Sequence, residues 1–254
     1  FRGEALSSIA SVSDFTLKTN QNSDSSGYEI NAICGEIKYI KPVSQKKGTY
    51  VNLRNLFFST PARLKFLKSE NYESFRIKKL IQRFALVNYN IQFNLYINNK
   101  KVIKTIPLMD KNNQFLDRVR EILGNEFVEN SIELNCSEKK FTLFGLLGIP
   151  TFNHSNSGNQ FVFVNNRIVT DKTLNIIFKV AYRDLISHKR FPQLVVNIIC
   201  PLDWVDVNVH PMKNEVRFLD TNYIKSFVIG SIKNSLKMIG HQNSNLVSTK
   251  LINK

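Results

Sequence analysis

The amino-acid sequence predicts an α+β fold made of two mixed domains. Apolar and polar residues alternate early in the chain, helical periodicity follows, and strands and helices intermix again in the second half. The 254 residues, of which 43% are hydrophobic, can bury one large core or two smaller ones. We therefore expect a first domain over residues 1–112, a second over residues 113–240, and a linker or tail over residues 241–254.

The first domain is predicted to begin with an antiparallel β-meander and to continue with helices. Ser59 and Thr60 are hydroxyl caps directly before Pro61, a combination that is typical of a helix start. Further on, Asn98 and Asn99 suit a tight hairpin, because Asn tolerates left-handed backbone. Strands are expected at residues 15–19, 28–34, 37–43, 91–97 and 102–106, and helices at 62–67 and 72–87.

The second domain is also predicted to be mixed. Gly124 directly follows an apolar-periodic segment and is expected to end its helix. From His241 onward the chain is rich in Asn, Ser and Lys, which is typical of a frayed tail or a linker. Strands are expected at residues 132–136, 141–148, 160–164, 193–200 and 205–210, helices at 115–123, 171–186 and 223–239, and a polar loop at 153–159.

The chain is strongly basic, with a formal net charge of +15 and a pI near 9.7. This balance favours a polyanionic partner, such as nucleic acid or an acidic membrane surface. A second explanation stays open. A composition rich in Lys, Asn and Ile also arises in proteins encoded by AT-rich DNA, where the charge is spread without being concentrated.

Cysteine spacing and hydropathy argue against some classes of protein. Cys34, Cys136 and Cys200 lie far apart and in no ligand-like spacing, so they indicate neither a disulfide framework nor a metal site. No apolar run reaches the length that spans a bilayer, and no secretory leader is recognisable. We expect no membrane association and a reducing, cytoplasmic location.

The chain opens inside a glycine-containing motif that leads into strong helix formers. Free backbone amides at such a helix start can receive phosphate oxygens, and glycine lets a ligand approach the backbone closely. An ordinary helix start explains the same residues, because Glu4 complements the helix dipole. The candidate phosphate-binding residues are Arg2, Gly3, Glu4, Ala5 and Leu6.

A second motif begins with Gly48 and Thr49 at an expected strand start. Glycine beside a hydroxyl can bring the backbone and the Thr49 side chain against a nucleotide base, directly or through a water molecule. The alternative is a plain corner between a strand and a capped helix. The spacing alone does not separate the two interpretations.

A third motif covers residues 205–218. Strand alternation places Asp206, Asn208 and His210 on one face, and Pro211 is expected to end the strand. Lys213 then lies on a loop, from which its ammonium can reach a phosphate as a compact charge. A polar strand face more often makes structural hydrogen bonds than it carries out acid–base chemistry.

A fourth feature is a basic stripe on the helix expected after Asp171. Helical periodicity puts the cations on one side and an apolar face of Leu174, Ile177, Phe178, Ala181 and Leu185 on the other. A basic stripe of this kind suits contact with a phosphate backbone, although a solvated helix face explains it equally well. The candidate DNA-binding residues are Arg167, Lys172, Lys179, Arg183, Lys189 and Arg190.

In this order and at these separations, the four segments resemble the MutL family of the GHKL ATPases. The most specific stretches are residues 1–6, 48–66 and 205–218, and the resemblance extends to about Ile239. Asn166 stands where relatives often have glycine, but Asn can adopt the same left-handed turn. Leu64 replaces a second basic residue of the family pattern, which removes one charge.

The resemblance implies a part of a GHKL α/β sandwich that carries the ATP lid and the Gly-Thr motif, followed by a second, ribosomal-protein-like domain with a β-α-β crossover. Residues 2–6 would hold the phosphates of ATP, residues 48–49 would lie by the adenine, and Lys213 would reach the γ-phosphate. The family's general-base glutamate and its Mg²⁺-binding asparagine are expected upstream of Phe1. We therefore expect the intact protein to hydrolyse ATP and this chain alone to be inactive.

The resemblance also implies a function and partners. The intact protein would be a DNA mismatch repair ATPase, an ATP-switched clamp on the DNA backbone and a matchmaker between a MutS-type mismatch-recognition protein and a downstream helicase or nuclease. It would form a homodimer through a C-terminal domain beyond this chain, at the nucleoid in the cytoplasm. Lys172 matches a basic family position that contacts DNA. The alternative is a nucleic-acid-binding module without a nucleotide role.

Overall fold

The computed structural model describes residues 4–22, 26–109, 113–207 and 215–252, with side chains up to Met238. Its contacts group the chain into two compact units, Phe1–Phe75 and Arg76–Lys254. This division falls earlier than the domain boundary predicted after residue 112. Residues 76–112 pack with the second half of the chain, so the two divisions group them differently.

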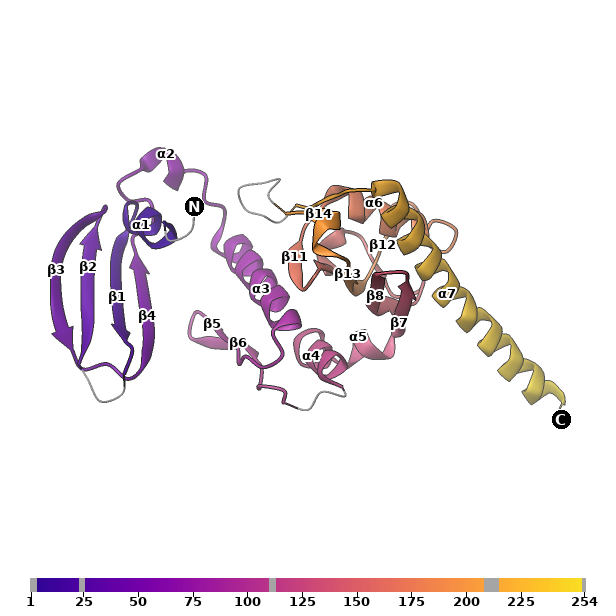
Figure 1. The fold of residues 1–254 in the computed structure, drawn as a ribbon. Helices are drawn as coiled ribbons and strands as arrows, with labels where there is room; N and C mark the ends of the chain where they lie inside the picture. Colours follow the sequence, from indigo (N-terminus) through magenta and orange to yellow (C-terminus); the bar gives the residue numbers. More distant parts are fainter. Residues whose placement is uncertain (1–3, 23–25, 110–112, 208–214, 253–254) are drawn as a thin grey trace. The chain divides into compact units, whose positions relative to one another are not determined.

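The first unit contains a four-stranded antiparallel sheet, shown on the left of Figure 1. Three consecutive strands form the predicted meander, but the fourth pairs with the first strand instead of the third, which gives the order β3-β2-β1-β4. The strands are β1 (Asp14–Asn20), β2 (Gly27–Ile33), β3 (Glu36–Val43) and β4 (Gly48–Arg54).

One face of this sheet packs on a short helix, α1 (Ala5–Ala10). The buried cluster holds Ala10, Phe15 and Ala32, with Ile9 and Leu17 packed against it. The opposite face is polar, and it is built around one buried carboxylate. Glu29 lies 3.0 Å from Lys18 Nζ and accepts a hydrogen bond of 2.8 Å from the Tyr39 hydroxyl. These two contacts hold the pKa of Glu29 below its ordinary value, and the contact with Lys18 has the larger effect.

The helices after the sheet begin near the expected residues but differ in length and capping. Helix α2 covers only Pro61–Leu64, and α3 covers Glu70–Val87. The predicted cap at Thr60 is wrong, because its hydroxyl donates to the Phe57 carbonyl oxygen at 3.4 Å and caps no helix amide. The helix after Pro61 is a single turn with no side-chain cap at its start.

The second unit is built on a five-stranded sheet of order β11-β10-β13-β8-β7. Strands β10 and β13 are parallel and the other pairs are antiparallel, so the segment that contains β11 and α6 is the crossover of a β-α-β unit, as predicted. The strands are β7 (Ser131–Glu138), β8 (Phe141–Gly148), β10 (Gln160–Val164), β11 (Arg167–Val169) and β13 (Leu194–Ile199).

Helices cover both faces of this sheet. On one face, α6 (Lys172–Ala181) and α7 (Thr221–Ile252) bury side chains such as Phe178 and Ile232 in the larger core cluster. On the other face, Leu86 of α3, Val119 of α4 (Gln114–Leu123) and Phe127 of α5 (Asn125–Glu129) pack against the sheet. The sheet is thus the middle of three layers.

Small elements complete the second unit. The hairpin expected at Asn98 and Asn99 is present, and both residues have the predicted left-handed backbone, as does Asn166. The short strands and turns are β5 (Asn94–Ile97), β6 (Lys100–Lys104), β9 (Asn153–His154), η1 (Ser157–Asn159), β12 (Phe191–Pro192), η2 (Leu202–Trp204), β14 (Val205–Asp206) and β15 (Arg217–Phe218).

Two predicted helix ends are wrong. Helix α6 ends at Ala181 instead of residue 186, because the Tyr182 side chain is buried and donates a 2.8 Å hydrogen bond to the Gly148 carbonyl oxygen. Leu185, expected on the apolar face, is therefore 48% exposed. Helix α7 was predicted to end near residue 239 but continues to Ile252.

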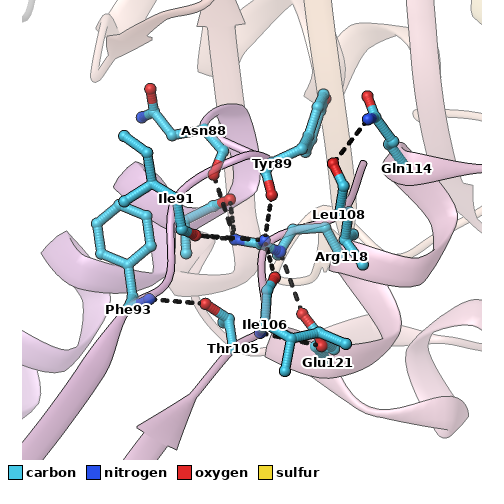
Figure 2. Close-up of polar contacts among 11 residues, drawn as sticks. Asn88, Tyr89, Ile91, Phe93, Thr105, Ile106, Leu108, Gln114, Arg118 and Glu121 are labelled. Atoms are coloured by element: carbon cyan, nitrogen blue, oxygen red, sulfur yellow. Dashed lines mark hydrogen bonds and ion pairs between the residues drawn. The ribbon is translucent and has the colours of Figure 1, made fainter. Parts of the chain in front are cut away.

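A buried arginine explains why residues 76–112 belong to the second unit. Arg118 of α4 is fully buried, and its guanidinium donates hydrogen bonds to carbonyl oxygens around it (Figure 2). The shortest are 2.7 Å to Tyr89, 2.8 Å to Ile106 and 3.1 Å to Ala85. Its Nε also lies 3.1 Å from Glu121 Oε2. One side chain thus joins α4 to the end of α3 and to the strand that leaves the hairpin.

Candidate functional site

The first candidate site is the start of α1. Phe1, Arg2 and Gly3 lie outside the described residues. Glu4 has helical backbone angles and its carbonyl oxygen accepts the first helical bond, 3.0 Å from the Ser8 amide. Glu4, Ala5 and Leu6 are all exposed. The amides of a first helical turn have no acceptor within the helix, so this end of α1 can donate to an anion.

The second candidate site is the start of β4. Gly48 has a φ of +135°, a conformation that side chains rarely adopt, while a Cβ added there would meet no atom within 4 Å. Glycine is therefore needed for the backbone angle and not for space. The Thr49 hydroxyl lies 3.2 Å from that of Thr19 and is exposed, so it can exchange that contact for one with a ligand.

The structure does not bring these two candidate sites together. Gly48 and Thr49 pair with Asn20 and Thr19 at the end of β1. Helix α1 lies at the other end of that strand, where Ala10 packs against Phe15 (Figure 1). Seven residues of extended chain span roughly 20 Å, so Gly48 lies about that far from the end of β1 against which Ala10 of α1 packs.

The third motif forms the base of a hairpin in the second unit. Val205 pairs with Phe218 and Asp206 pairs with Arg217. Of the strand predicted at residues 205–210, the structure describes residues 205–207, and only Val205 and Asp206 form a strand. Lys213, together with Asn208 and His210, lies outside the described residues, so its contact with a phosphate stays a prediction.

The basic stripe of α6 is present on the surface. Asp171 caps the helix by accepting a 3.0 Å hydrogen bond from the Leu174 amide, which fixes where the stripe begins. Leu174, Ile177, Phe178 and Ala181 are buried as predicted, which turns the opposite side of the helix outward. Arg167, Lys172, Arg183, Lys189 and Arg190 are exposed, and Lys179 is half-buried.

Two of these cations border one shallow hollow. Lys179 and Arg183 line an apolar depression of about 190 Å³ that also includes Ile176 and Val180. The Lys179 ammonium lies 4.6 Å from the centre of the Phe191 ring, which holds it in place.

The neighbouring acid on this surface is already neutralised. Asp184 lies 3.1 Å from Lys233, and this hydrogen bond is the main cause that lowers the pKa of Asp184. The charge of Arg183 also lowers this pKa, so the acid interacts with both cations.

The rest of the predicted basic surface is less uniform. The Arg190 guanidinium donates to the side chain and the carbonyl oxygen of Asn153, so it joins β9 to the end of the α6 crossover. This role is structural. Arg167 stands on the edge strand β11, and no described contact joins it or Lys189 to the others.

Sequence reasoning missed another basic group. Arg76, Lys79 and Arg83 share one side of α3 because they are three and four residues apart. The spacing alone could have revealed it, but not the burial. Burial and then the charges of Arg83 and Lys78 lower the pKa of Lys79 to about 8. Burial and then the charge of Arg76 lower the pKa of Arg83.

The described residues contain neither a metal-binding cluster nor a membrane-spanning helix. Within the described ranges, no three His, Cys, Asp or Glu side chains gather where they could hold a metal ion. The Mg²⁺ ligand that the resemblance places upstream of Phe1 stays a prediction. None of the described helices combines the length and the apolarity needed to cross a membrane.

Comparison with known proteins identifies close similarities. Residues 119–237 match the family model described as "DNA mismatch repair protein, C-terminal domain". The chain is 38% identical over 253 residues to the DNA mismatch repair protein MutL of Agrobacterium fabrum, covering 100% of this chain and 41% of that protein. It is 36% identical to MutL of Rickettsia bellii, covering 99% of this chain and 41% of that protein.

A solved structure agrees with these sequence matches. The MutL ATPase domain of Aquifex aeolicus, in complex with ADP, superposes with a TM-score of 0.62 and 29% identity over 78% of this chain and 72% of that one. The predicted α+β fold of this ATPase class is therefore confirmed. The chain spans about two fifths of the length of its curated relatives. By sequence along its whole length and by fold, the chain belongs to the MutL family of DNA mismatch repair proteins.

Proposed function

We propose that the intact protein is a DNA mismatch repair ATPase that acts as an ATP-switched clamp on DNA. The observation that carries this proposal is the similarity of the whole chain to MutL proteins, joined to a fold shared with a MutL ATPase domain that binds ADP. In that role it would link a MutS-type mismatch-recognition protein to a downstream helicase or nuclease, as a homodimer at the nucleoid. Residues 1–112 would serve the nucleotide and residues 113–240 would transmit its state.

The residues of this chain would supply only part of the nucleotide site. The first-turn amides of α1 would receive phosphate oxygens, together with Arg2 and Gly3. Gly48 and Thr49 would approach the base, for which the open space at Gly48 and the exposed Thr49 hydroxyl give support. These groups lie at opposite ends of β1, and further residues of the intact protein would complete the site.

Lys213 would make the protein respond to the nucleotide. Its ammonium would neutralise oxygens of the terminal phosphate, which ATP has and ADP lacks. A contact available in only one nucleotide state shifts the equilibrium between two domain arrangements. The short β14–β15 hairpin would carry this lysine on its loop.

DNA would be held through its backbone, without base reading. The exposed cations Arg167, Lys172, Arg183 and Lys189 would contact phosphates, and the half-buried Lys179 would border the same surface as Arg183. Arg190 would contribute less, because its guanidinium is already bonded to Asn153.

A substitution at Lys213 in the complete protein tests the switch. Lys213→Ala is expected to abolish the change in protease sensitivity that ATP causes, while DNA affinity without nucleotide stays within about twofold. Lys104→Ala, which removes an exposed lysine of β6, is the matched control and should behave as wild type. A normal ATP response in Lys213→Ala would contradict the proposal.

The alternative function is a nucleic-acid-binding module with no nucleotide role, favoured by the net charge of +15 and the exposed cations around α6. It predicts that ATP changes neither DNA affinity nor conformation in the complete protein.

We also propose that the 254-residue chain by itself turns over no ATP. Steady phosphate release by a pure sample of this chain would refute that proposal.

A further inference from the structure

The basic group on α3 has a charge arrangement that is unfavourable by itself. Arg76, Lys79 and Arg83 lie on one side of the helix, and like charges at such spacings destabilise a helix. Lys79 and Arg83 are also half-buried, where cations are normally paired with an acid. The charges of Arg83 and Lys78 lower the pKa of Lys79, and the charge of Arg76 lowers that of Arg83.

Arg83 is the cation of this group whose guanidinium lacks an acceptor in the described part of the protein. Its guanidinium makes no hydrogen bond or ion pair with any residue in the described part of the chain, although burial lowers its pKa. Arg118 of helix α4 shows the contrast, because its buried guanidinium donates hydrogen bonds to several carbonyl oxygens and its Nε lies 3.1 Å from Glu121 Oε2. A half-buried guanidinium that has no acceptor in the protein is stabilised when an external anion binds it.

Lys79 is held in a fixed orientation beside this guanidinium. Its ammonium donates a 2.7 Å hydrogen bond to Asn159 Oδ1, and Asn159 in turn donates 2.7 Å to Gln193 Oε1. The ammonium also lies 5.0 Å from the centre of the Phe161 ring. The position of the positive charge is thus set before any ligand arrives, which lowers the entropy lost on binding.

We propose that Lys79 and Arg83 together bind one phosphate group of a nucleic-acid backbone. The planar fork of arginine and the compact charge of lysine are the pair that binds phosphate in proteins. Helix α3 packs on the opposite face of the five-stranded sheet from α6, so this would be a second contact surface, separate from the α6 stripe. The nucleic-acid source rests on the proposed function, whereas the anion site itself does not.

The first test uses the complete protein and measures the affinity for duplex DNA over a range of salt concentrations. The double variant Lys79→Gln with Arg83→Gln is compared with Lys100→Gln and Lys104→Gln, which remove two exposed lysines of the same unit. Loss of one phosphate contact reduces the slope of log K against log salt by about 0.9. The ratio of wild-type to variant affinity should therefore be about eightfold larger at 0.1 M salt than at 1 M salt. Equal behaviour of the two double variants would overturn the proposal.

The second test uses the wild-type protein and does not depend on how the variants fold. An amine with a pKa of about 8 reacts readily with an acylating reagent near that pH, and a bound phosphate protects it by stabilising the ammonium. We expect duplex DNA to protect Lys79, as read by peptide mass spectrometry. Protection by millimolar inorganic phosphate but not by DNA would assign the site to free phosphate, and equal protection by poly-L-glutamate would remove the preference for phosphate. Either outcome overturns the nucleic-acid site.

The two proposals can fail separately. Lys172→Gln with Arg183→Gln tests the α6 surface in the same salt titration. If this variant weakens DNA binding and the α3 double variant does not, only the second surface is lost. If wild type binds no DNA at any salt concentration, both surfaces are refuted.

Discussion

Replacement of Arg118 by methionine should cost the second unit a large part of its stability. The side chain is fully buried, and three of its hydrogen bonds to carbonyl oxygens, from Tyr89, Ile106 and Ala85, measure 3.1 Å or less. Hydrogen bonds from a charged group contribute about 1.5–3 kcal/mol each. Removal of one partner of a buried charged network typically costs about 3–5 kcal/mol, because the polar groups that remain stay buried without a partner. We expect the free energy of unfolding to fall by that amount.

The assay is urea denaturation followed by tryptophan fluorescence. Trp204, the one tryptophan of the chain, lies in the second unit with its ring centre 4.9 Å from that of Phe141, so it reports on this unit. Arg118→Lys keeps the charge but has fewer donors and no planar fork, and should cost about 2 kcal/mol.

The matched control for Arg118 is an exposed arginine of the same helix. Arg120 pairs with Asp117 at 2.8 Å, and about half of each side chain is exposed. Arg120→Met should cost at most about 0.5 kcal/mol. A loss for Arg118→Met within 1 kcal/mol of the control, about the precision of such measurements, would refute the role assigned to the buried guanidinium.

Further substitutions test particular contacts by the same denaturation assay. Gly230→Ala in α7 should stabilise by about 0.5–1 kcal/mol, since a Cβ there meets no atom within 4 Å. Gly145→Ala should prevent folding of the second unit, because its Cβ would lie 2.0 Å from the Val195 carbonyl oxygen; a folded variant contradicts this. Asp171→Ala should cost about 1 kcal/mol through loss of the bond from the Leu174 amide, and an unchanged midpoint would refute the cap. The pKa of Lys79, about 8 when folded, lies below its ordinary value of 10.5, so the unfolded chain binds more protons between these values and stability rises with pH there. After allowance for solvent screening, the rise should be about 1–2 kcal/mol and should be absent in Lys79→Met.

Local patterns in the sequence were sufficient for much of the architecture. Alternation predicted β1 to β3, the apolar face of α6 was predicted residue by residue from Leu174 to Ala181, and Asn98 and Asn99 adopt the left-handed backbone expected of them. The β-α-β crossover and the family were also predicted, from motifs that lie in a fixed order. These features depend on side-chain periodicity or on the φ preference of single residues, so a short window of sequence contains them.

The candidate site was predicted less completely. The cations of the α6 surface were expected, but the bond of Arg190 to Asn153 and the buried setting of Lys79 and Arg83 were not. A basic spacing looks the same in sequence whether the side chain is solvated or packed beside Asn159 and Phe161. Burial depends on which distant segment packs against the helix, and a local sequence pattern does not predict that segment.

The sequence by itself determined where most of the long strands and helices lie, which side of α6 is apolar, and to which family the chain belongs. Only the tertiary structure decided that β4 pairs with β1, that Gly48 lies at the opposite end of the sheet from α1, and that Arg118 attaches residues 85–106 to α4. The physical reason is the same in each case. Backbone hydrogen bonds and buried charges are satisfied by partners far away in the sequence, and chain folding selects those partners from many that are locally equivalent.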